Sequence, residues 1–179
     1  MRRWTLPSIA LTLFVLAALP GAAQQPAASP LAGTWQHAGP VEQAQATVQQ
    51  AIEPVVLGVT PDLQQFARAR IAESTWVPQT IVIQPTPERI SVQLSGQEQR
   101  TFETAPNQPQ NVYSRSGVRA QLVQRYRPDG GIEQIFTAVD GVQSNVLVPV
   151  AGNRMNLDVT MTAPRLPRPI QFRLQYTRR

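Results

Sequence analysis

The hydrophobic period of the chain changes near Thr80, and this change constrains the fold more than any other feature. Over residues 41–56, apolar side chains recur at spacings of three and four, the period of an amphipathic helix. A second helix is expected from Pro61, because Thr60 can cap it and proline is favoured at the first helical position. From Thr80 onward, apolar and polar residues alternate as in strands. The order predicts a helical hairpin over residues 41–75, followed by a run of strands.

Tight-turn signals divide the second part of the chain into seven or eight short strands. These signals are Pro85-Thr86-Pro87, Ser95-Gly96, Asp129-Gly130-Gly131 and Asp140-Gly141. Alternation is clearest over residues 155–162 and 170–177, where one face is apolar and the other polar. The stretch 100–113 is less regular. There we expect a strand near Thr101-Phe102 and a Pro- and Asn-rich loop over residues 106–110.

Strands that pair in sequence order leave two edges of the sheet without partners. Long exposed edges promote aggregation, and closure into a barrel removes them. We therefore predict a mainly β protein, an antiparallel up-and-down β-barrel with the helical hairpin inserted after a short first strand. That first strand is expected to begin at Gly33.

The first predicted strand opens with Gly33-Thr34-Trp35, which resembles the Gly-x-Trp of the calycins, the superfamily of lipocalins and fatty-acid-binding proteins. Helices placed directly after this strand are similar to the fatty-acid-binding branch, in which a helical hairpin covers the mouth of the barrel. The resemblance implies structural roles for Gly33 and Trp35. It also implies that Trp35 packs against a basic side chain near the C-terminus, and Arg178 is the candidate. The chain is therefore expected to be calycin-like.

The last predicted strand departs from the fatty-acid-binding pattern. In that family, an Arg-x-Tyr in the closing strand holds the ligand carboxylate. Here the sequence is Leu174-Gln175-Tyr176, so only the tyrosine matches. Arg173 points to the other face by strand alternation. The resemblance thus implies a ligand contact for Tyr176 without implying recognition of a carboxylate.

A barrel places one face of each strand inside. The apolar residues expected to point inward are Ile81, Ile83, Ile90, Val92, Leu122, Phe136, Val146, Met155, Leu157, Val159, Phe172 and Leu174. An apolar cavity with a few fixed polar groups suits a hydrophobic small molecule or lipid. The expected ligand contacts are Phe136, Met155, Leu157, Phe172, Leu174, Tyr176, Gln124 and Gln134. Alternation is the same in hollow and packed barrels, so a filled core is the alternative.

The N-terminus has the pattern of a secretory signal peptide. Met1-Arg2-Arg3 is basic, residues 9–19 are almost continuously apolar, and Gly21-Ala22-Ala23 supplies small residues for cleavage. A retained anchor is the alternative, but the apolar run is shorter than the roughly 20 residues needed to span a bilayer. We expect a signal peptide over residues 1–23, a disordered lead-in over 24–30 and one domain over 31–179. The location would be periplasmic or secreted.

Composition excludes several classes of function. The chain has no cysteine, which excludes disulfides, thiolate metal sites, thiol catalysis and lipid attachment through cysteine. All 16 basic residues are arginine, and loss of Arg2 and Arg3 leaves 14 against 11 acidic residues. These arginines are scattered along the chain, whereas a nucleic-acid-binding protein usually clusters them with aromatic residues. We expect no nucleic-acid partner.

Catalytic and metal-binding patterns are missing from the sequence. The single histidine, His37, follows the Trp35 strand, where a strand-end or turn residue is expected. No serine has a plausible histidine and acid partner, and no phosphate-binding loop or metal-ligand spacing is present. The prediction is a non-enzymatic protein without a cofactor or metal.

The runner-up interpretation is a structural or interaction module of the cell envelope. Residues 164–169, Pro-Arg-Leu-Pro-Arg-Pro, are interpreted as a rigid, charged hairpin loop. This loop or the helical hairpin could dock a protein partner. Exposed apolar residues on the helices would favour docking, whereas a cavity roofed by the helices would favour a ligand. No membrane span is expected after cleavage of the signal peptide.

Overall fold

The computed structural model describes residues 29–72, 75–114 and 117–179. The predicted signal peptide and residues 24–28 of the lead-in lie outside the described residues. The elements in chain order are β1 (Gly33–His37), α1 (Val41–Val56), α2 (Pro61–Ala72), β2 (Thr80–Pro85), β3 (Ile90–Ser95), β4 (Gln99–Thr104), β5 (Gln110–Tyr113), β6 (Arg119–Tyr126), β7 (Ile132–Ala138), β8 (Gly141–Val150), β9 (Arg154–Thr162) and β10 (Ile170–Arg178). Neither described helix combines the length and the hydropathy that a bilayer crossing requires.

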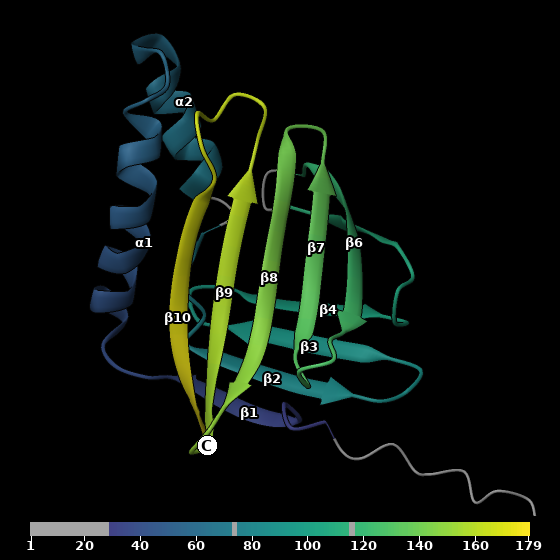
Figure 1. The fold of residues 1–179 in the computed structure, drawn as a ribbon. Coiled ribbons are helices and arrows are strands. Elements are labelled where there is room, and N and C mark those ends of the chain that lie inside the picture. The colour runs from purple at the N-terminus through teal and green to yellow at the C-terminus, as the bar shows by residue number, and fades with distance from the viewer. Residues whose placement is uncertain (1–28, 73–74, 115–116) are drawn as a thin grey trace, which may run out of the picture.

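The ten described strands form one antiparallel sheet (Figure 1). Their order is β4-β3-β2-β1-β10-β9-β8-β7-β6-β5. Consecutive strands are neighbours in the sheet except β4 and β5, which lie at its two edges, and β1 also pairs with β10. Trp35 lies opposite Arg178 in that pairing, which joins the two ends of the meander. The predicted mainly β, up-and-down barrel with a helical hairpin after its first strand is confirmed.

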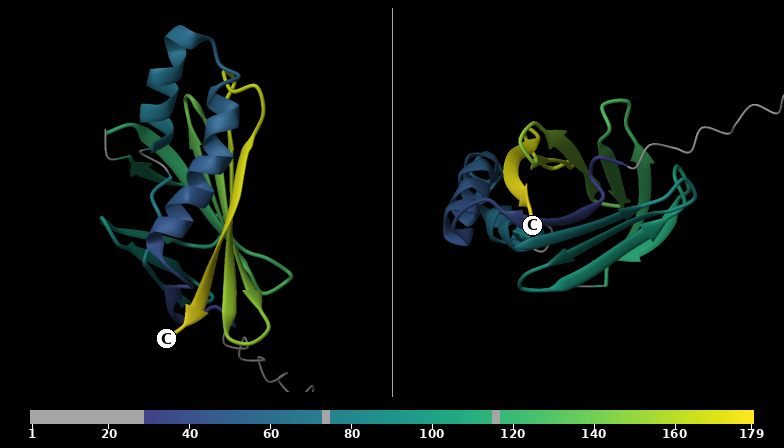
Figure 2. Two further views of the ribbon diagram at one scale, coloured as in Figure 1. Left: turned by 90° about the vertical axis from the view of Figure 1, so that its left-hand side faces the viewer. Right: turned by 90° about the horizontal axis from the view of Figure 1, so that it is seen from below.

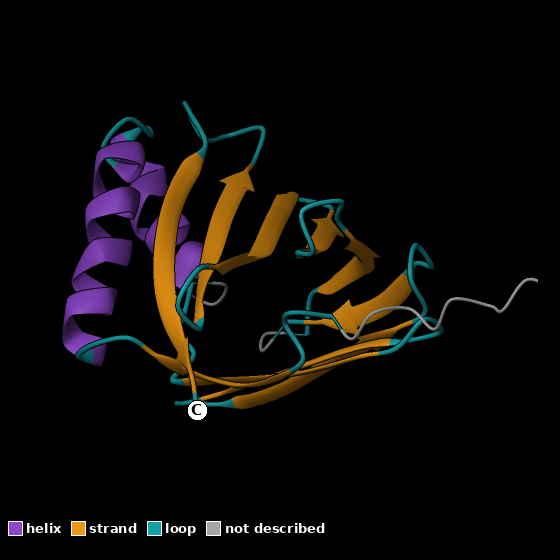
Figure 3. Cartoon of the chain, turned by 60° about the horizontal axis from the view of Figure 1, so that its bottom comes forward, coloured by secondary structure: helices purple, strands orange, loops and turns teal. Residues whose placement is uncertain are grey.

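Closure of the barrel is nearly complete. No ladder joins β4 to β5 within the described strands. At one end, β6 bridges the gap, because the Gln124 side-chain amide donates to the Ile90 carbonyl of β3 at 2.9 Å. The Asn107 backbone N–H, in the loop between β4 and β5, also donates to the Gln124 carbonyl at 2.7 Å. Figure 3 shows the strands curled around an interior, with both helices on one side.

Nine strands follow the helices, instead of the seven or eight predicted. The irregular stretch 99–113 contains both β4 and β5. Polar outward positions and the inward-facing Arg100 hide the alternation of β4, whose Phe102 and Thr104 are more buried than their neighbours. β5 is only four residues long and largely exposed, which leaves little hydrophobic signal in the sequence.

The strand β8 has the opposite face inward from the one predicted. Val146 was expected inside, but it lies between Glu133 and Asp158 on the outer face, whereas Leu147 is 1% exposed. Valines occupy most of the outer positions of this strand, so apolar content favours the wrong face. The pairing register decides the orientation, because a shift of one residue exchanges the two faces of a strand.

The two helices have different positions relative to the barrel. α1 packs alongside β10 and buries Ala44, Val48 and Ile52 (Figure 2). α2 begins at Pro61, as predicted, and runs back toward the barrel. An ion pair of 2.6 Å between Arg68 and Glu53 connects the helices. The hairpin therefore presents α2 to the barrel interior.

The end of the barrel that holds the C-terminus and residues 29–35 is filled. Fully buried side chains there come from the first strand and from the middle of the sheet. They include Leu31, Trp35, Ile83, Ile90, Ile132, Leu147 and Met155. This part of the barrel is therefore packed, as the filled-core alternative expects.

Candidate ligand-binding cavity

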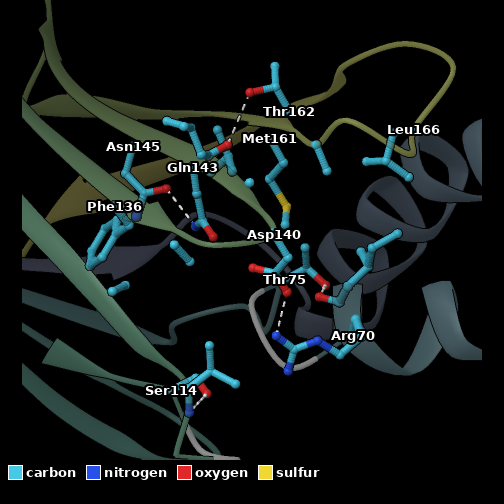
Figure 4. Close-up of a pocket in the computed structure, with 18 of the residues that line it drawn as sticks. Arg70, Thr75, Ser114, Phe136, Asp140, Gln143, Asn145, Met161, Thr162 and Leu166 are labelled. Carbon is cyan, nitrogen blue, oxygen red and sulfur yellow. Dashed lines mark hydrogen bonds and ion pairs between the residues drawn. The ribbon is translucent and has the colours of Figure 1, made fainter.

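A cavity of about 660 Å³ lies between α2 and the inner faces of the sheet (Figure 4). Its volume falls within the range of roughly 300–1,000 Å³ that is usual for small-molecule sites. Most of its wall is apolar. The apolar side chains of the wall include Val59, Leu63, Phe66, Ala67, Ile71, Leu94, Phe102, Phe136, Leu157, Val159, Met161, Phe172 and Leu174.

The wall is built by alternation in the strands and by one face of α2. In β9 and β10, every second residue points inward, which brings Leu157 and Val159 together with Phe172 and Leu174. Phe136 of β7 meets Phe102 of β4 edge to face, with ring centroids 5.1 Å apart. Strands that are distant in the sheet therefore contribute to one apolar surface.

An ion pair crosses the mouth of the cavity. Arg70 of α2 contacts Asp140, in the turn between β7 and β8, with a nitrogen–oxygen distance of 2.6 Å. Both side chains are partly exposed, so the pair contributes little to stability. Its position connects the helical roof to the rim of the barrel (Figure 4).

A second cavity of about 410 Å³ lies at the unpaired edges of β4 and β5. Arg100, Phe102 and Tyr113 line both cavities. The Arg100 guanidinium donates to one carboxylate oxygen of Glu98 at 2.8 and 2.9 Å, so its charge is compensated locally. The gap in the sheet thus forms a side wall that is polar at Arg100.

The wall also contains uncharged polar groups on β8 and next to α2. Gln143 and Asn145 of β8 both line the cavity, and the Gln143 side-chain nitrogen donates to the Asn145 side-chain oxygen at 2.9 Å. Asn145 is 7% exposed. Near α2, the Thr75 hydroxyl donates to the Ile71 carbonyl at 2.9 Å.

Four of the eight predicted ligand contacts line the cavity: Phe136, Leu157, Phe172 and Leu174. The other four, Met155, Gln124, Gln134 and Tyr176, lie outside its wall. Met155 belongs to the filled end. Strand alternation identifies the inner face but not the depth at which packing stops, so it cannot separate these two groups.

The two glutamines form a structural network in the core. Gln134 donates to the Gln124 side-chain oxygen at 2.8 Å, and Gln124 donates to the Ile90 carbonyl and to the Thr104 hydroxyl. Both glutamines are essentially unexposed. Because their amides hydrogen-bond within the barrel, they bridge β6, β7 and the edge formed by β3 and β4.

Tyr176 also has a structural role. Its hydroxyl donates a hydrogen bond to the Pro78 carbonyl at 2.9 Å, and its ring is fully buried. Burial raises the pKa of the Tyr176 phenol far above its usual range. His37 packs edge-on against this ring, with centroids 5.4 Å apart, at the start of the segment that leads into α1.

The Gly33, Trp35 and Arg178 group lies at the filled end. The Arg178 guanidinium carbon is 4.7 Å from the centroid of the Trp35 ring, and the indole N–H donates to the Leu31 carbonyl at 2.8 Å. Gly33 has a φ of 132°, which side-chain-bearing residues rarely adopt, and Arg178 lies beside it. Arg178 also donates to the Pro30 carbonyl. None of these residues lines the cavity.

Comparison with solved structures identifies the same arrangement in other proteins. The REP1-NXSQ fatty acid transporter aligns with a TM-score of 0.54 and 14% identity, covering 85% of this chain and 98% of that one. Fatty-acid-binding protein 1 of Echinococcus granulosus gives 0.51 and 10%, covering 83% and 97%. The Schistosoma mansoni fatty acid binding protein in complex with arachidonic acid gives 0.52 and 14%, covering 84% and 97%. The fold is that of the fatty-acid-binding proteins.

The fatty-acid-binding-protein fold confirms the calycin-like prediction. At 10–14% identity the likeness shows the fold alone. No family model matches the sequence, and no curated protein matches it.

Sequence reasoning missed the cavity residues Gln143, Asn145, Arg70 and Asp140. Gln143 and Asn145 were missed because β8 was assigned the opposite face. The available signal was a pair of amide side chains at alternate positions of β8, on the same face as the buried Leu147. The pairing of Arg70 with Asp140 left no such signal, because it joins residues that are 70 positions apart.

Proposed function

We propose that this chain is an exported, non-enzymatic binding protein that holds a hydrophobic small molecule or lipid in the cavity beneath α2. One observation carries the proposal: a volume of about 660 Å³ is bounded mostly by apolar side chains. The fatty-acid ligands named for proteins of the same fold support it. The signal-peptide pattern over residues 1–23 supports export, in the periplasm or outside the cell.

The energetics of this site suit a ligand with an aliphatic chain. Each methylene group transferred from water to an apolar cavity contributes about 0.8 kcal/mol. An apolar tail of about ten carbons would thus gain roughly 8 kcal/mol before the cost of association is subtracted. Binding would need no covalent or catalytic step, because burial alone supplies the affinity.

The direct test is native mass spectrometry of the mature protein purified from its own host. A co-purified mass that organic solvent removes is expected, together with displacement of an environment-sensitive fatty-acid probe by added lipid. Absence of both a bound mass and probe binding would contradict the proposal.

A matched pair of variants locates the site. Ala120 of β6 lines the cavity, whereas its neighbour Gln121 is exposed on the outer face. Ala120→Trp should fill part of the cavity and lower probe affinity at least about tenfold, which corresponds to about 1.4 kcal/mol. Gln121→Trp should leave probe affinity unchanged. Equal effects of the two variants would place the probe elsewhere.

An interaction module is the second candidate function. Leu57 and Phe66 on the helical hairpin are each 61% exposed, which is the feature that favours docking of a protein partner in the envelope. Crosslinking of the protein in its own host distinguishes the candidates. A specific crosslinked partner lost in the Leu57→Ser variant, together with no bound lipid in the wild-type protein, would favour the module.

A further inference from the structure

Gln143 and Asn145 form a polar pair on an otherwise apolar part of the cavity wall. Their nearest inward neighbours in the adjacent strands are Gln134 and Phe136 on β7 and Val159 and Met161 on β9. Each of these neighbours is uncharged. Figure 4 shows the two amides side by side on β8, joined by one hydrogen bond.

The hydrogen bonds of this pair are incomplete. One amide donates to the other at 2.9 Å, which leaves the Asn145 nitrogen and the Gln143 oxygen without a protein partner among the described residues. No side-chain nitrogen or oxygen in the described structure is both fully enclosed and unpaired. Because Asn145 is 7% exposed and lines the cavity, its free nitrogen is reached from the cavity. Exchanging nitrogen and oxygen in both amides would still leave one donor and one acceptor.

The charged side chains that line the cavity come from α2, β4, the turn after β7 and the loop after β9, and two of the three arginines are paired with acids. Arg70 pairs with Asp140 at the mouth, and Arg100 pairs with Glu98 at the gap beside β4. Arg165 lies in the exposed loop between β9 and β10. An ionised carboxylate at the amide pair would lose its hydration without meeting a cation, which is strongly unfavourable. A hydroxyl can instead accept from Asn145 and donate to Gln143 through a single oxygen.

We propose that Gln143 and Asn145 form a subsite for the hydroxyl of an uncharged, long-chain or polycyclic alcohol, and that the chain prefers such alcohols to ionised fatty acids. This inference rests on the proposed function, because it assigns the polar end of the ligand within the same cavity. The apolar body of the alcohol packs against the wall formed by Phe136, Leu157 and Phe172. This orientation places the hydroxyl at β8, inside the cavity.

The test compares three ligands of equal chain length on the full mature chain. Displacement of an uncharged environment-sensitive probe is measured at about pH 8 with 1-tetradecanol, tetradecanoate and tetradecyl methyl ether, a pH at which a fatty carboxyl is ionised. Tetradecanol should bind about tenfold more tightly than either of the others, as expected for one well-placed hydrogen-bond pair. Tetradecanoate binding as tightly as the alcohol, or more tightly, would overturn the inference without needing any variant.

The variants assign the preference to the pair. Gln143→Met and Asn145→Leu replace the amides with apolar groups of similar size, and Gln121→Met makes the same change on the outer face. The two inner variants should reduce the preference for alcohol over ether to within about twofold while ether affinity is retained. The outer variant should keep the tenfold preference. An undiminished preference in the inner variants would overturn the subsite.

The proposed function and the inference fail in different ways. If all three ligands bind equally and Ala120→Trp blocks them, the cavity binds ligands but the amide subsite is refuted. If no ligand displaces the probe and Ala120→Trp does not change probe affinity, both proposals are refuted. Both proposals are supported if the wild type prefers alcohol to ether tenfold, Asn145→Leu abolishes this preference and Ala120→Trp blocks binding of the ligands.

Discussion

The Tyr176 side chain is buried, and its hydroxyl is bound to the Pro78 carbonyl. Burial raises the pKa of this phenol in the folded state, whereas in the unfolded chain it titrates near 10. Above about pH 10 the unfolded state therefore loses this proton while the native state keeps it. The stabilisation is complete below the unfolded pKa and declines as pH rises beyond it.

Tyr176→Phe should remove this pH dependence. Between about pH 9.5 and 11.5, the free energy of unfolding of the wild type should fall more steeply than that of the variant, by up to about 1.4 kcal/mol per pH unit. Below this range the variant should be less stable by about 1–3 kcal/mol, because the buried Pro78 carbonyl loses its donor. Urea denaturation at a series of pH values measures both effects. Parallel pH profiles would contradict the assignment.

The orientation of β8 determines which of its residues contribute to the core. Leu147→Ala should destabilise the protein by about 2–5 kcal/mol, because it removes a fully buried side chain. Val146→Ala should cost less than about 1 kcal/mol, because Val146 is half-buried on the outer face. Denaturant unfolding of both variants tests the register. A larger loss of unfolding free energy for Val146→Ala than for Leu147→Ala would support the orientation expected from the sequence.

α2 contacts the turn after β7 through the ion pair between Arg70 and Asp140. Asp140→Asn should weaken the 2.6 Å ion pair with Arg70 and loosen the roof over the cavity. We expect the ligand dissociation rate to rise a few-fold, with a loss of unfolding free energy below about 1 kcal/mol, as is usual for exposed ion pairs. Stopped-flow displacement of a bound probe measures the rate.

The control for this ion pair is Asp158→Asn. Asp158 pairs with Arg173 on the outer face of β9 and β10, away from the cavity. Its substitution should change stability by a similar amount and leave the dissociation rate unaltered. If both variants release the probe equally fast, the Arg70–Asp140 pair has no role at the mouth.

For the whole molecule, the barrel interior is divided into a filled end and a hollow end. Trp35 and Arg178 close the meander at the filled end, where β1 joins β10. The cavity occupies the other end, below α2. This division allows the domain to keep a packed core while leaving about 660 Å³ for a ligand.

Export is predicted to remove residues 1–23 from the chain. The mature protein isolated from its own host should begin at Gln24, after cleavage behind Ala23. N-terminal sequencing of the protein released from the envelope or the medium measures this directly. An intact Met1 in the isolated protein would contradict the predicted processing.

Much of the fold could be predicted because its signals are local. The helix start at Pro61 and the alternation in β9 and β10 depend on residues that are close in sequence. β4 and β5 were harder, because their polar and exposed residues carry little periodicity. The site was only half predictable, since Phe136 and Leu157 line the cavity whereas Gln124 and Tyr176 hydrogen-bond elsewhere.

The order of elements, the antiparallel meander and the apolar face of most strands are predictable from the amino-acid sequence. These follow from hydrophobic period and turn chemistry, which act over a few residues. The inward face of β8, the pairing of Arg70 with Asp140 and the boundary between the packed and hollow parts of the barrel are set by the folded structure. These depend on strand register and on contacts between residues far apart in the chain. Gln143 and Asn145 line the cavity because the register of β8 turns their side chains inward.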